Sequence, residues 1–121
     1  MEEAFSRTAM LLGEDGVERL KTARVAVFGL GGVGGYVVEA LARAGIGQLD
    51  LIDKDTVSVS NLNRQILATH STVGMLKVDA ARQRVLDINP ACSVKTYPIF
   101  YTPDTAVPLG SPFGRAVSRT D

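Results

Sequence analysis

Short, mainly apolar runs alternate along the chain with segments whose apolar residues recur at helical spacing. Residues 24–28 (RVAVF) and 48–52 (QLDLI) have the length and composition of buried strands in a parallel sheet. Residues 92–97 (CSVKTY) alternate well enough to predict a third strand. Because neighbouring parallel strands need a crossover connection, we expect a helix in each interval between these runs.

The first of these intervals begins with glycines and continues as a helix. A glycine-rich turn over residues 29–35 leads into an apolar helix, which we expect from about Gly32 to Ala44. Glycine follows directly at position 45, as it commonly does beyond a helix C-terminus. Ahead of the first strand, residues 3–23 predict another helix with a break around Gly13–Gly16.

Two more helices are expected between the second and third strands. Residues 61–67 predict a short helix, and residues 73–88 predict a longer one with an apolar stripe on one side. The alternating order of strands and helices predicts an α/β fold, the N-terminal half of a Rossmann-like doubly wound parallel sheet with right-handed crossovers. We expect a three-stranded parallel sheet over residues 24–97, with the helix that begins at about Gly32 packed on one face.

The last part of the chain does not continue this alternation. Residues 106–121 are rich in proline, glycine and serine and show no convincing periodicity. A doubly wound sheet normally continues through further strands, so a sheet of three would leave an apolar edge open. We therefore expect residues 1–105 to form an incomplete nucleotide-binding domain and residues 106–121 to form an irregular or non-native tail. A genuine but unusual C-terminal loop is the alternative.

Composition narrows the class of protein. The 121 residues suit one domain of ordinary size, and a content of 45% apolar and 21% charged residues excludes wholesale disorder. Thirteen Lys and Arg residues balance thirteen Asp and Glu residues, which argues against a strongly basic nucleic-acid module. The single cysteine, Cys92, excludes an internal disulfide framework. Together with the lack of a secretory signal pattern, it favours a reducing, cytoplasmic compartment.

The turn after the first strand has the sequence GLGGVG, which matches G-x-G-x-x-G between a strand and a helix. In that pattern Gly29 permits the tight turn, Gly31 lets a phosphate approach the backbone, and Gly34 lets helix and strand pack closely. The helix N-terminus adds free N–H groups and the positive end of its dipole. The context favours a phosphate-binding turn, with a tight turn that binds no ligand as the alternative.

Asp53 ends the second strand, where a carboxylate can accept hydrogen bonds from the ribose hydroxyls of an adenine nucleotide. For this residue, capping of the following turn is the alternative role. The glycine turn and Asp53 alone fit a nicotinamide-dependent dehydrogenase equally well.

Two cations that follow Asp53 separate these possibilities. Arg64 lies in the sequence SNLNRQ, and Lys77 lies further along the chain. A helix over residues 61–67 would place Asn61 and Arg64 on one face. Attack of a carboxylate on an α-phosphate needs such cations because negative charge accumulates there, whereas hydride transfer does not. The pattern favours phosphate activation, with a solvent-exposed helix face as the alternative for Arg64.

Several segments together resemble the ubiquitin-activating-enzyme-like superfamily. They are FSR near the start, VFGLGGVGG, LIDKDTVSVSNLNRQ and TVGMLKVDAARQRVLDINP, and the resemblance covers residues 5–104. Bacterial members include the adenylyltransferases that activate sulfur-carrier proteins of molybdopterin and thiamine synthesis. The segments FSRT, NRQI followed by TVG, and FYTPD are most similar to the branch that acts on threonylcarbamoyladenosine in tRNA.

The resemblance implies a role for each position that matches the family's motifs. Contacts to ATP are implied for Gly32, Asp53, Asn61, Arg64 and Lys77, with Ser60 and Gln65 as supporting residues of the binding site. Asp53 would hold the ribose, and Arg64 and Lys77 would act on the phosphates during catalysis. Arg7 would reach into the neighbouring subunit's site, which implies a homodimer. A solvated arginine near the helix start is the alternative for that position.

The resemblance also implies the reaction. ATP with Mg²⁺ would adenylate the carboxylate of threonylcarbamoyladenosine in tRNA, and loss of AMP with ring closure would give a net dehydration. The C-terminus of a sulfur-carrier protein is the alternative acceptor. A nicotinamide-dependent dehydrogenase and a non-catalytic nucleotide-binding remnant are alternatives of other classes. The family's Mg²⁺-positioning acidic residue follows its fourth strand, and nothing here matches it, so we expect a truncated and inactive member.

No metal site is expected from this chain's own residues. His70 is the only histidine and lies in a polar stretch without a second ligand type nearby. Asp53 and Asp55 are explained by strand-end and turn roles. Cys92 is expected to be buried in the third strand, since Lys95 is the only basic residue near it.

Overall fold

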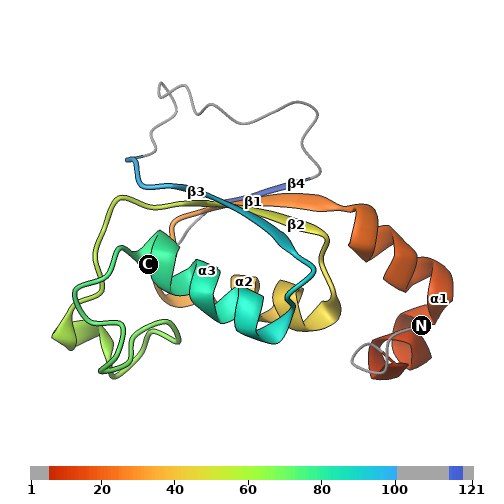
Figure 1. Cartoon of the computed structure of the whole chain (residues 1–121), viewed down its shortest axis with the longest axis horizontal. Helices are drawn as coiled ribbons and strands as arrows, with labels where there is room; N and C mark the ends of the chain where they lie inside the picture. Colours follow the sequence, from red (N-terminus) through yellow and green to blue (C-terminus); the bar gives the residue numbers. More distant parts are fainter. Residues whose placement is uncertain (1–5, 101–114, 119–121) are drawn as a thin grey trace.

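The computed structural model describes residues 6–100 and 115–118, and a parallel β-sheet forms its centre (Figure 1). The strands are β1 (Arg24–Phe28), β2 (Gln48–Ile52), β3 (Ser93–Tyr97) and β4 (Arg115–Ser118), in the order β3-β2-β1-β4. Every neighbouring pair is parallel. The strands predicted at residues 24–28 and 48–52 are confirmed, and the third begins at residue 93.

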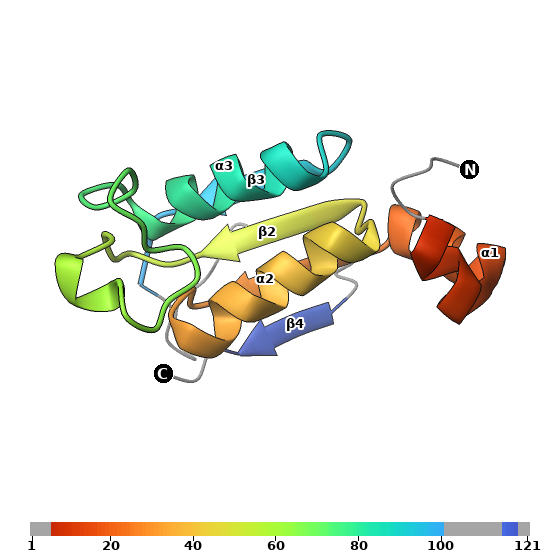
Figure 2. The same ribbon diagram turned by 90° about the horizontal axis from the view of Figure 1, so that it is seen from below.

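Two crossover helices lie on the same face of the sheet (Figures 1 and 2). α2 (Gly32–Ala44) joins β1 to β2, and α3 (Lys77–Ile88) joins β2 to β3. The predicted α/β fold is confirmed, since consecutive crossovers of one hand place both helices on one side of the sheet. Between the two layers lies an apolar core, whose buried members are Val25, Val27, Leu30, Val38, Ala42, Ile46, Leu49, Leu51, Leu67, Val78, Ala81, Val85 and Cys92.

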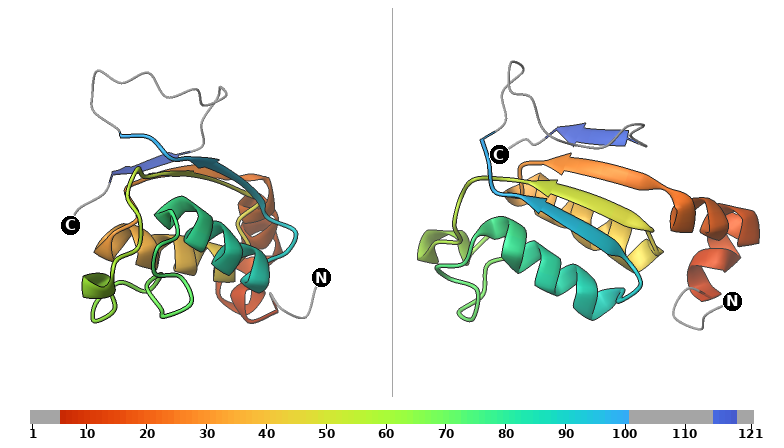
Figure 3. Two further views of the ribbon diagram at one scale, coloured as in Figure 1. Left: turned by 60° about the vertical axis from the view of Figure 1, so that its left-hand side comes forward. Right: turned by 45° about the horizontal axis from the view of Figure 1, so that its top comes forward.

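The three parallel strands expected over residues 24–97 are present, and a fourth strand, in the segment that was expected to be irregular, adds to them. β4 lies within residues 106–121 and pairs with β1 from Val25–Arg115 to Phe28–Ser118 (Figure 3). Its place beside β1 is the place of the fourth strand in the doubly wound order 3-2-1-4. The outer edge of β1 is therefore covered by β4. The domain boundary at residue 105 stays a prediction.

α1 (Ser6–Thr22) precedes the sheet and lies at one end of the molecule (Figure 2). The predicted break is confirmed at Gly13, whose φ of 76° interrupts the helical backbone. The end of α1 contacts the turn before β2, where the N–H of Gly47 donates to the Leu20 carbonyl (2.9 Å). A Cβ at position 47 would lie 1.8 Å from the carbonyl oxygen of Lys21, so only glycine fits there.

The connection from β2 to α3 differs from the predicted helix over residues 61–67. A short 3₁₀ helix, η2 (Val59–Asn61), is followed by turns. α3 begins at Lys77 and not at residue 73, because Leu76 forms an antiparallel bridge with Thr56. The connection therefore folds back along the end of the sheet before α3 begins.

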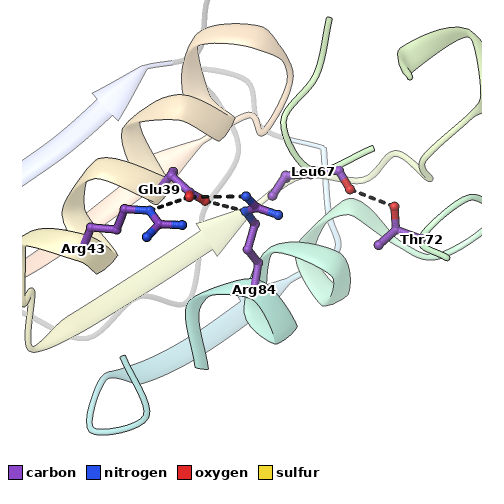
Figure 4. Close-up of polar contacts among 5 residues, drawn as sticks. All are labelled: Glu39, Arg43, Leu67, Thr72 and Arg84. Atoms are coloured by element: carbon purple, nitrogen blue, oxygen red, sulfur yellow. Dashed lines mark hydrogen bonds and ion pairs between the residues drawn. The ribbon is translucent and has the colours of Figure 1, made fainter. Parts of the chain in front are cut away.

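A network of ion pairs joins α2 to α3 (Figure 4). Glu39 on α2 accepts hydrogen bonds from Arg43, one turn later (2.6 Å), and from Nε of Arg84 on α3. The hydrogen bond from Arg84 is the main cause that lowers the pKa of the Glu39 carboxyl. Just before α3, the Thr72 hydroxyl donates to the Leu67 carbonyl (2.7 Å). These contacts hold α3, and with it Lys77, in place relative to α2.

Residues outside the site follow the expectations from the sequence. Cys92 is buried, and burial raises the pKa of its thiol to about 11. His70 is exposed in the loop before α3. None of the helices in the described ranges combines the length and apolar character that crossing a membrane requires.

Candidate functional site

A cleft opens at the carboxyl ends of β1 and β2, next to the N-terminus of α2. Its volume is about 710 Å³, and it is lined by Phe28, Gly29, Gly31, Gly32, Val33, Tyr36, Ile52, Asp53, Lys54, Asp55, Arg64, Gln65, Lys77, Ile99 and Phe100. The cleft lies beside the point where the strand order reverses, since the chain runs from β1 outward through β2 to β3 and β4 then lies on the other side of β1. In open α/β sheets this switch in strand order is the usual place for a ligand.

The glycine turn between β1 and α2 needs two of its glycines for its own conformation. Gly29 has a φ of 90°, in the left-handed region, and its N–H donates to the Ile52 carbonyl (2.7 Å). A Cβ on Gly34 would lie 1.9 Å from the carbonyl oxygen of Gly29. Gly34 therefore packs α2 against the turn and does not line the cleft, in agreement with the role that the motif gives it.

Gly31 and Gly32, the other two glycines of the GLGGVG motif, are not required by any contact within the described part of the protein. A Cβ on Gly32 would meet no atom within 4 Å, and one on Gly31 would meet only the Gln65 amide at an ordinary 3.7 Å. Both residues line the cleft at the start of α2, where Gly31 is the N-cap and forms no side-chain cap. The missing side chains leave space in front of the helix N-terminus, where backbone N–H groups and the helix dipole favour an anion.

Asp53 joins the end of β2 to the glycine turn. Its side chain is 9% exposed. One oxygen, Oδ2, accepts a hydrogen bond from the N–H of Leu30 (2.7 Å), and Oδ1 accepts one from the N–H of Asp55 (2.8 Å). A carboxylate can accept about four hydrogen bonds, so these two leave capacity for a ligand hydroxyl. Both the turn-capping role and the cleft position expected for Asp53 are therefore present.

Lys77, the first residue of α3, brings a positive charge to the cleft. The residue as a whole is only 8% exposed, but its ammonium nitrogen is not among the buried polar atoms without a partner, so the charged end reaches the cleft. No side chain in the described part of the chain forms an ion pair or a hydrogen bond with its ammonium group. An ammonium that reaches the cleft and has no partner among the described residues is available to an anion bound there.

Arg64 lines the same cleft from the turns after η2. One guanidinium nitrogen, Nη1, donates to the Ser60 carbonyl (2.9 Å) and to Oδ1 of Asn63 (3.2 Å). These two bonds hold the side chain while the remaining N–H groups can serve a ligand. The sequence analysis paired Lys77 with Arg64, and the structure brings the two into one cleft.

The neighbours of Arg64 have different places. Gln65 lines the cleft beside Gly31. Asn61 is buried outside the lining, and its Oδ1 accepts hydrogen bonds from the N–H (2.9 Å) and the hydroxyl (3.1 Å) of Ser58. Ser60 is exposed, with its hydroxyl 2.9 Å from that of Ser58. Asn61 and Ser60 thus build the turn that carries Arg64, and their contact with a nucleotide stays a prediction.

Arg7 belongs to the first turn of α1, but its side chain lies outside what the structure describes. The predicted role of Arg7 in a neighbouring subunit's site therefore stays a prediction. No group of three or more His, Cys, Asp and Glu side chains within the described ranges could hold a metal ion.

The sequence analysis missed the apolar part of the lining. Phe28 and Ile52 are the last residues of β1 and β2, and Ile99 and Phe100 follow β3. Val33, Tyr36, Lys54 and Asp55 complete the lining residues that were not predicted. All of these residues except Val33 and Tyr36, which lie in α2, are at or just beyond the carboxyl end of a strand, where residues of a parallel sheet face the ligand edge. The cleft thus offers an apolar part together with a cationic, glycine-lined part, which fits a nucleotide.

Comparison with known proteins agrees with this geometry. The ThiF family matches residues 5–118. The tRNA threonylcarbamoyladenosine dehydratase of Bacillus subtilis is 50% identical over 105 residues, which are 87% of this chain and 41% of that protein. The molybdopterin-synthase adenylyltransferase of Salmonella typhimurium is 51% identical over 92 residues, which are 74% of this chain and 37% of that protein.

A solved structure has the same fold. The tRNA N6-threonylcarbamoyladenosine dehydratase of Escherichia coli in complex with ATP superposes with a TM-score of 0.82 and is 45% identical, covering 84% of this chain and 42% of that one. The chain thus spans about two fifths of the length of the relatives that it matches. Since the family match extends over nearly all of the 121 residues, the chain belongs to the ThiF family.

Proposed function

We propose that this chain is the nucleotide-binding, N-terminal part of an ATP-dependent enzyme that adenylates the carboxylate of threonylcarbamoyladenosine in tRNA. The observation that carries the proposal is the ammonium of Lys77, which reaches the cleft without a partner among the described residues, next to a glycine turn whose Gly31 and Gly32 leave open space. The similarity to the Bacillus subtilis dehydratase supports this choice of acceptor.

The proposed reaction places negative charge where the cations lie. A carboxylate oxygen of the nucleoside attacks the α-phosphorus of ATP, the bond to the β-phosphate oxygen breaks, and pyrophosphate leaves. An internal nucleophile then displaces AMP and closes a ring, so that water is lost overall. Lys77 and Arg64 would neutralise the charge that builds up on the phosphates, and the N-terminus of α2 would hold phosphate oxygens.

Binding of the sugar and base would use the other end of the cleft. Asp53 has acceptor capacity left for a ribose hydroxyl, and the apolar lining suits a heterocyclic base. A nicotinamide dinucleotide would use the same glycine turn and Asp53, but hydride transfer builds up no charge on the phosphates and so needs no Lys77 and Arg64 beside them. ATP is therefore the nucleotide that these residues favour.

A second acceptor has independent support. The Salmonella typhimurium relative, named as a molybdopterin-synthase adenylyltransferase, is as similar to this chain as the dehydratase is, although over fewer residues. The C-terminal carboxylate of a sulfur-carrier protein is therefore our second candidate, with the same adenylation chemistry.

Three features of the proposal concern the complete enzyme. We expect it to be a homodimer in which Arg7 contributes to the neighbouring subunit's site, to use Mg²⁺ with ATP, and to act in the cytoplasm. The matching positions in this chain support the first, and the chemistry of ATP supports the second. A carboxylate that positions Mg²⁺ would have to come from beyond the residues that match the family's nucleotide motifs.

Calorimetry with ATP and with NAD tests the nucleotide. We expect the 121-residue chain to bind ATP at least about ten times more tightly than NAD, because a triphosphate brings more negative charge to Lys77 and Arg64 than the pyrophosphate of NAD does. Replacement of the exposed Lys95 by Met should leave both affinities unchanged, while Lys77→Met should weaken ATP binding. Tighter binding of NAD would reject the proposal in favour of a dehydrogenase. Pyrophosphate release after addition of either modified tRNA or a carrier protein then separates the two acceptors.

A further inference from the structure

Exposed apolar side chains are concentrated at the cleft. In the described part of the chain the large hydrophobic residues that are exposed are Val33 (48%), Tyr36 (58%), Val59 (68%) and Phe100 (57%), and all but Val59 line the cleft. Side chains of this kind are normally buried unless they meet a ligand or a partner. Phe100 belongs to neither apolar core cluster, so its place at the cleft is not explained by packing within the domain.

A cation holds the ring of Phe100. The ammonium of Lys54 lies over this ring, 5.1 Å from its centroid, within the range of a cation–π contact. Lys54 directly follows Asp53 at the end of β2, and Phe100 follows β3, the strand that pairs with β2. The register of two neighbouring strands thus brings the ammonium and the ring together, and both line the cleft.

We propose that Phe100 is the stacking platform for the base of the bound nucleotide and that Lys54 is the residue that positions its ring. The inference rests on the proposed function, because it assumes a nucleotide in the cleft. The ammonium covers one face of the ring, which leaves the other face for a planar base. Base–aromatic stacking is insensitive to sequence but grows with the area of the base, so purines are favoured over pyrimidines.

A phosphate-binding role for Lys54 fits the structure less well. The buried Lys77, the guanidinium of Arg64 and the N-terminus of α2 already supply positive charge to the cleft. Lys54 is exposed and engaged with an aromatic ring, whereas Lys77 has no partner in the described ranges. Binding of a ligand that has phosphates but no base should therefore depend on Lys77 and not on Lys54.

Binding measurements on the 121-residue chain test the platform with ATP, CTP and inorganic tripolyphosphate as probes. Phe100→Leu should weaken ATP binding by about 5- to 50-fold, CTP binding by less, and tripolyphosphate binding not at all. Phe100→Tyr keeps the ring and should restore the affinity for ATP. Val59→Ser, which alters an exposed apolar residue outside the cleft, is the control and should change none of the three affinities. Equal weakening of ATP and tripolyphosphate by Phe100→Leu would overturn the inference.

The positioning role of Lys54 needs a readout that reports on stacking. The triphosphate of 2-aminopurine riboside loses fluorescence when its base stacks, and we expect quenching on binding to the wild-type chain. Lys54→Met should reduce both the quenching and the affinity for ATP, and Lys54→Arg should restore them because it keeps a cation over the ring. Full quenching in Lys54→Met, or weaker binding of tripolyphosphate to this variant, would refute the role.

The outcomes separate this inference from the proposed function. A wild-type chain that binds no ATP would overturn both. A wild-type chain that binds ATP and loses the affinity in Lys77→Met, but not in Phe100→Leu, would keep the proposed function and overturn only the platform. Thermal melting of each variant, followed by circular dichroism, identifies any variant that fails to fold; in that case Phe100→Tyr and Lys54→Arg decide.

Discussion

The Asp53 carboxylate and the Leu30 backbone are joined by a buried hydrogen bond of 2.7 Å, across the gap between the end of β2 and the glycine turn. The other carboxylate oxygen accepts from the N–H of Asp55, which starts the following turn. One side chain therefore fixes both loops that form this edge of the cleft. Any contact that Asp53 makes with a ribose depends on the same carboxylate being held in this way.

Replacement of Asp53 by Asn should affect folding and binding together. An amide has one acceptor oxygen and presents N–H groups to the backbone donor on its other side, so at least one of the two hydrogen bonds is lost. We expect the free energy of unfolding to fall by about 1–3 kcal/mol, and the affinity for ATP to fall as the turn loosens. Urea denaturation and calorimetry measure the two effects.

The control for Asp53→Asn is Asp87→Asn, which makes the same chemical change at an exposed position of α3. It should change neither stability nor affinity by more than about 0.5 kcal/mol. If Asp53→Asn were as stable as the wild type, the hydrogen bonds from Leu30 and Asp55 would not be fixing the two loops.

The glycines of the turn allow a matched pair of alanine substitutions. Gly34→Ala places a Cβ 1.9 Å from a backbone oxygen, so we expect it to lower the free energy of unfolding by at least about 3 kcal/mol. Gly32→Ala meets no protein atom within 4 Å, so the chain should remain as stable as the wild type. Its methyl group would occupy space in front of the helix N-terminus, and ATP binding should weaken by about tenfold or more.

Thermal melting and calorimetry on both variants check this pair. The informative result is the separation of the two effects, with stability lost in Gly34→Ala and affinity lost in Gly32→Ala. A Gly32→Ala variant that binds ATP as tightly as the wild type would mean that no phosphate approaches this part of the turn.

Elements that are marked by a short sequence pattern could be predicted from the sequence alone. β1 and β2 are buried on both faces, so each is a mainly apolar run that can be recognised in the sequence. The break at Gly13 and the start of α2 near Gly32 follow from glycine chemistry. The cationic half of the cleft was predictable because Arg64 and Lys77 lie in motifs with a fixed distance from Asp53.

The remaining features depend on contacts between distant parts of the chain. β4 is defined by its pairing with β1 and not by a pattern of its own. Residues 62–67 form turns where an α-helix was predicted, and the 3₁₀ helix before them ends at Asn61, whose Oδ1 accepts a hydrogen bond from the N–H of Ser58. The contact of Lys54 with Phe100 exists only because β2 and β3 pair in one register.

Glu39 should make stability depend on pH. Its folded-state pKa is lowered, mainly by the hydrogen bond from Arg84, so the network stabilises the fold above the ordinary carboxyl pKa of 4.5 and loses this contribution as pH falls through the lower folded value. At pH 7 we expect Glu39→Gln to be less stable than the wild type by about 0.5–1.5 kcal/mol, because the ion pairs are partly exposed. The difference should shrink as the pH is lowered below 4.5.

Urea denaturation between about pH 3 and pH 8 measures this difference for Glu39→Gln and for Glu18→Gln. Glu18 pairs with Lys21 on the surface of α1 at 3.6 Å and is 67% exposed, so its substitution should have almost no effect at any pH. A stability difference for Glu39→Gln that stayed constant down to pH 3 would contradict the lowered pKa.

Substitution of Lys77 should affect binding and leave stability nearly unchanged. Lys77→Met keeps the aliphatic stem and removes an ammonium that reaches the cleft and has no partner among the described residues, so the free energy of unfolding should change by less than about 1 kcal/mol. The same change removes a charge-assisted contact, so ATP binding should weaken by about 10- to 100-fold. In a form of the enzyme that releases pyrophosphate, the rate should fall by about two orders of magnitude or more.

Denaturation and calorimetry on the same samples, with Lys95→Met as the exposed control, measure the effects of Lys77→Met on stability and on ATP binding. If Lys77→Met proved less stable and still bound ATP normally, the ammonium would be a structural group and the phosphate site would have to lie elsewhere in the cleft.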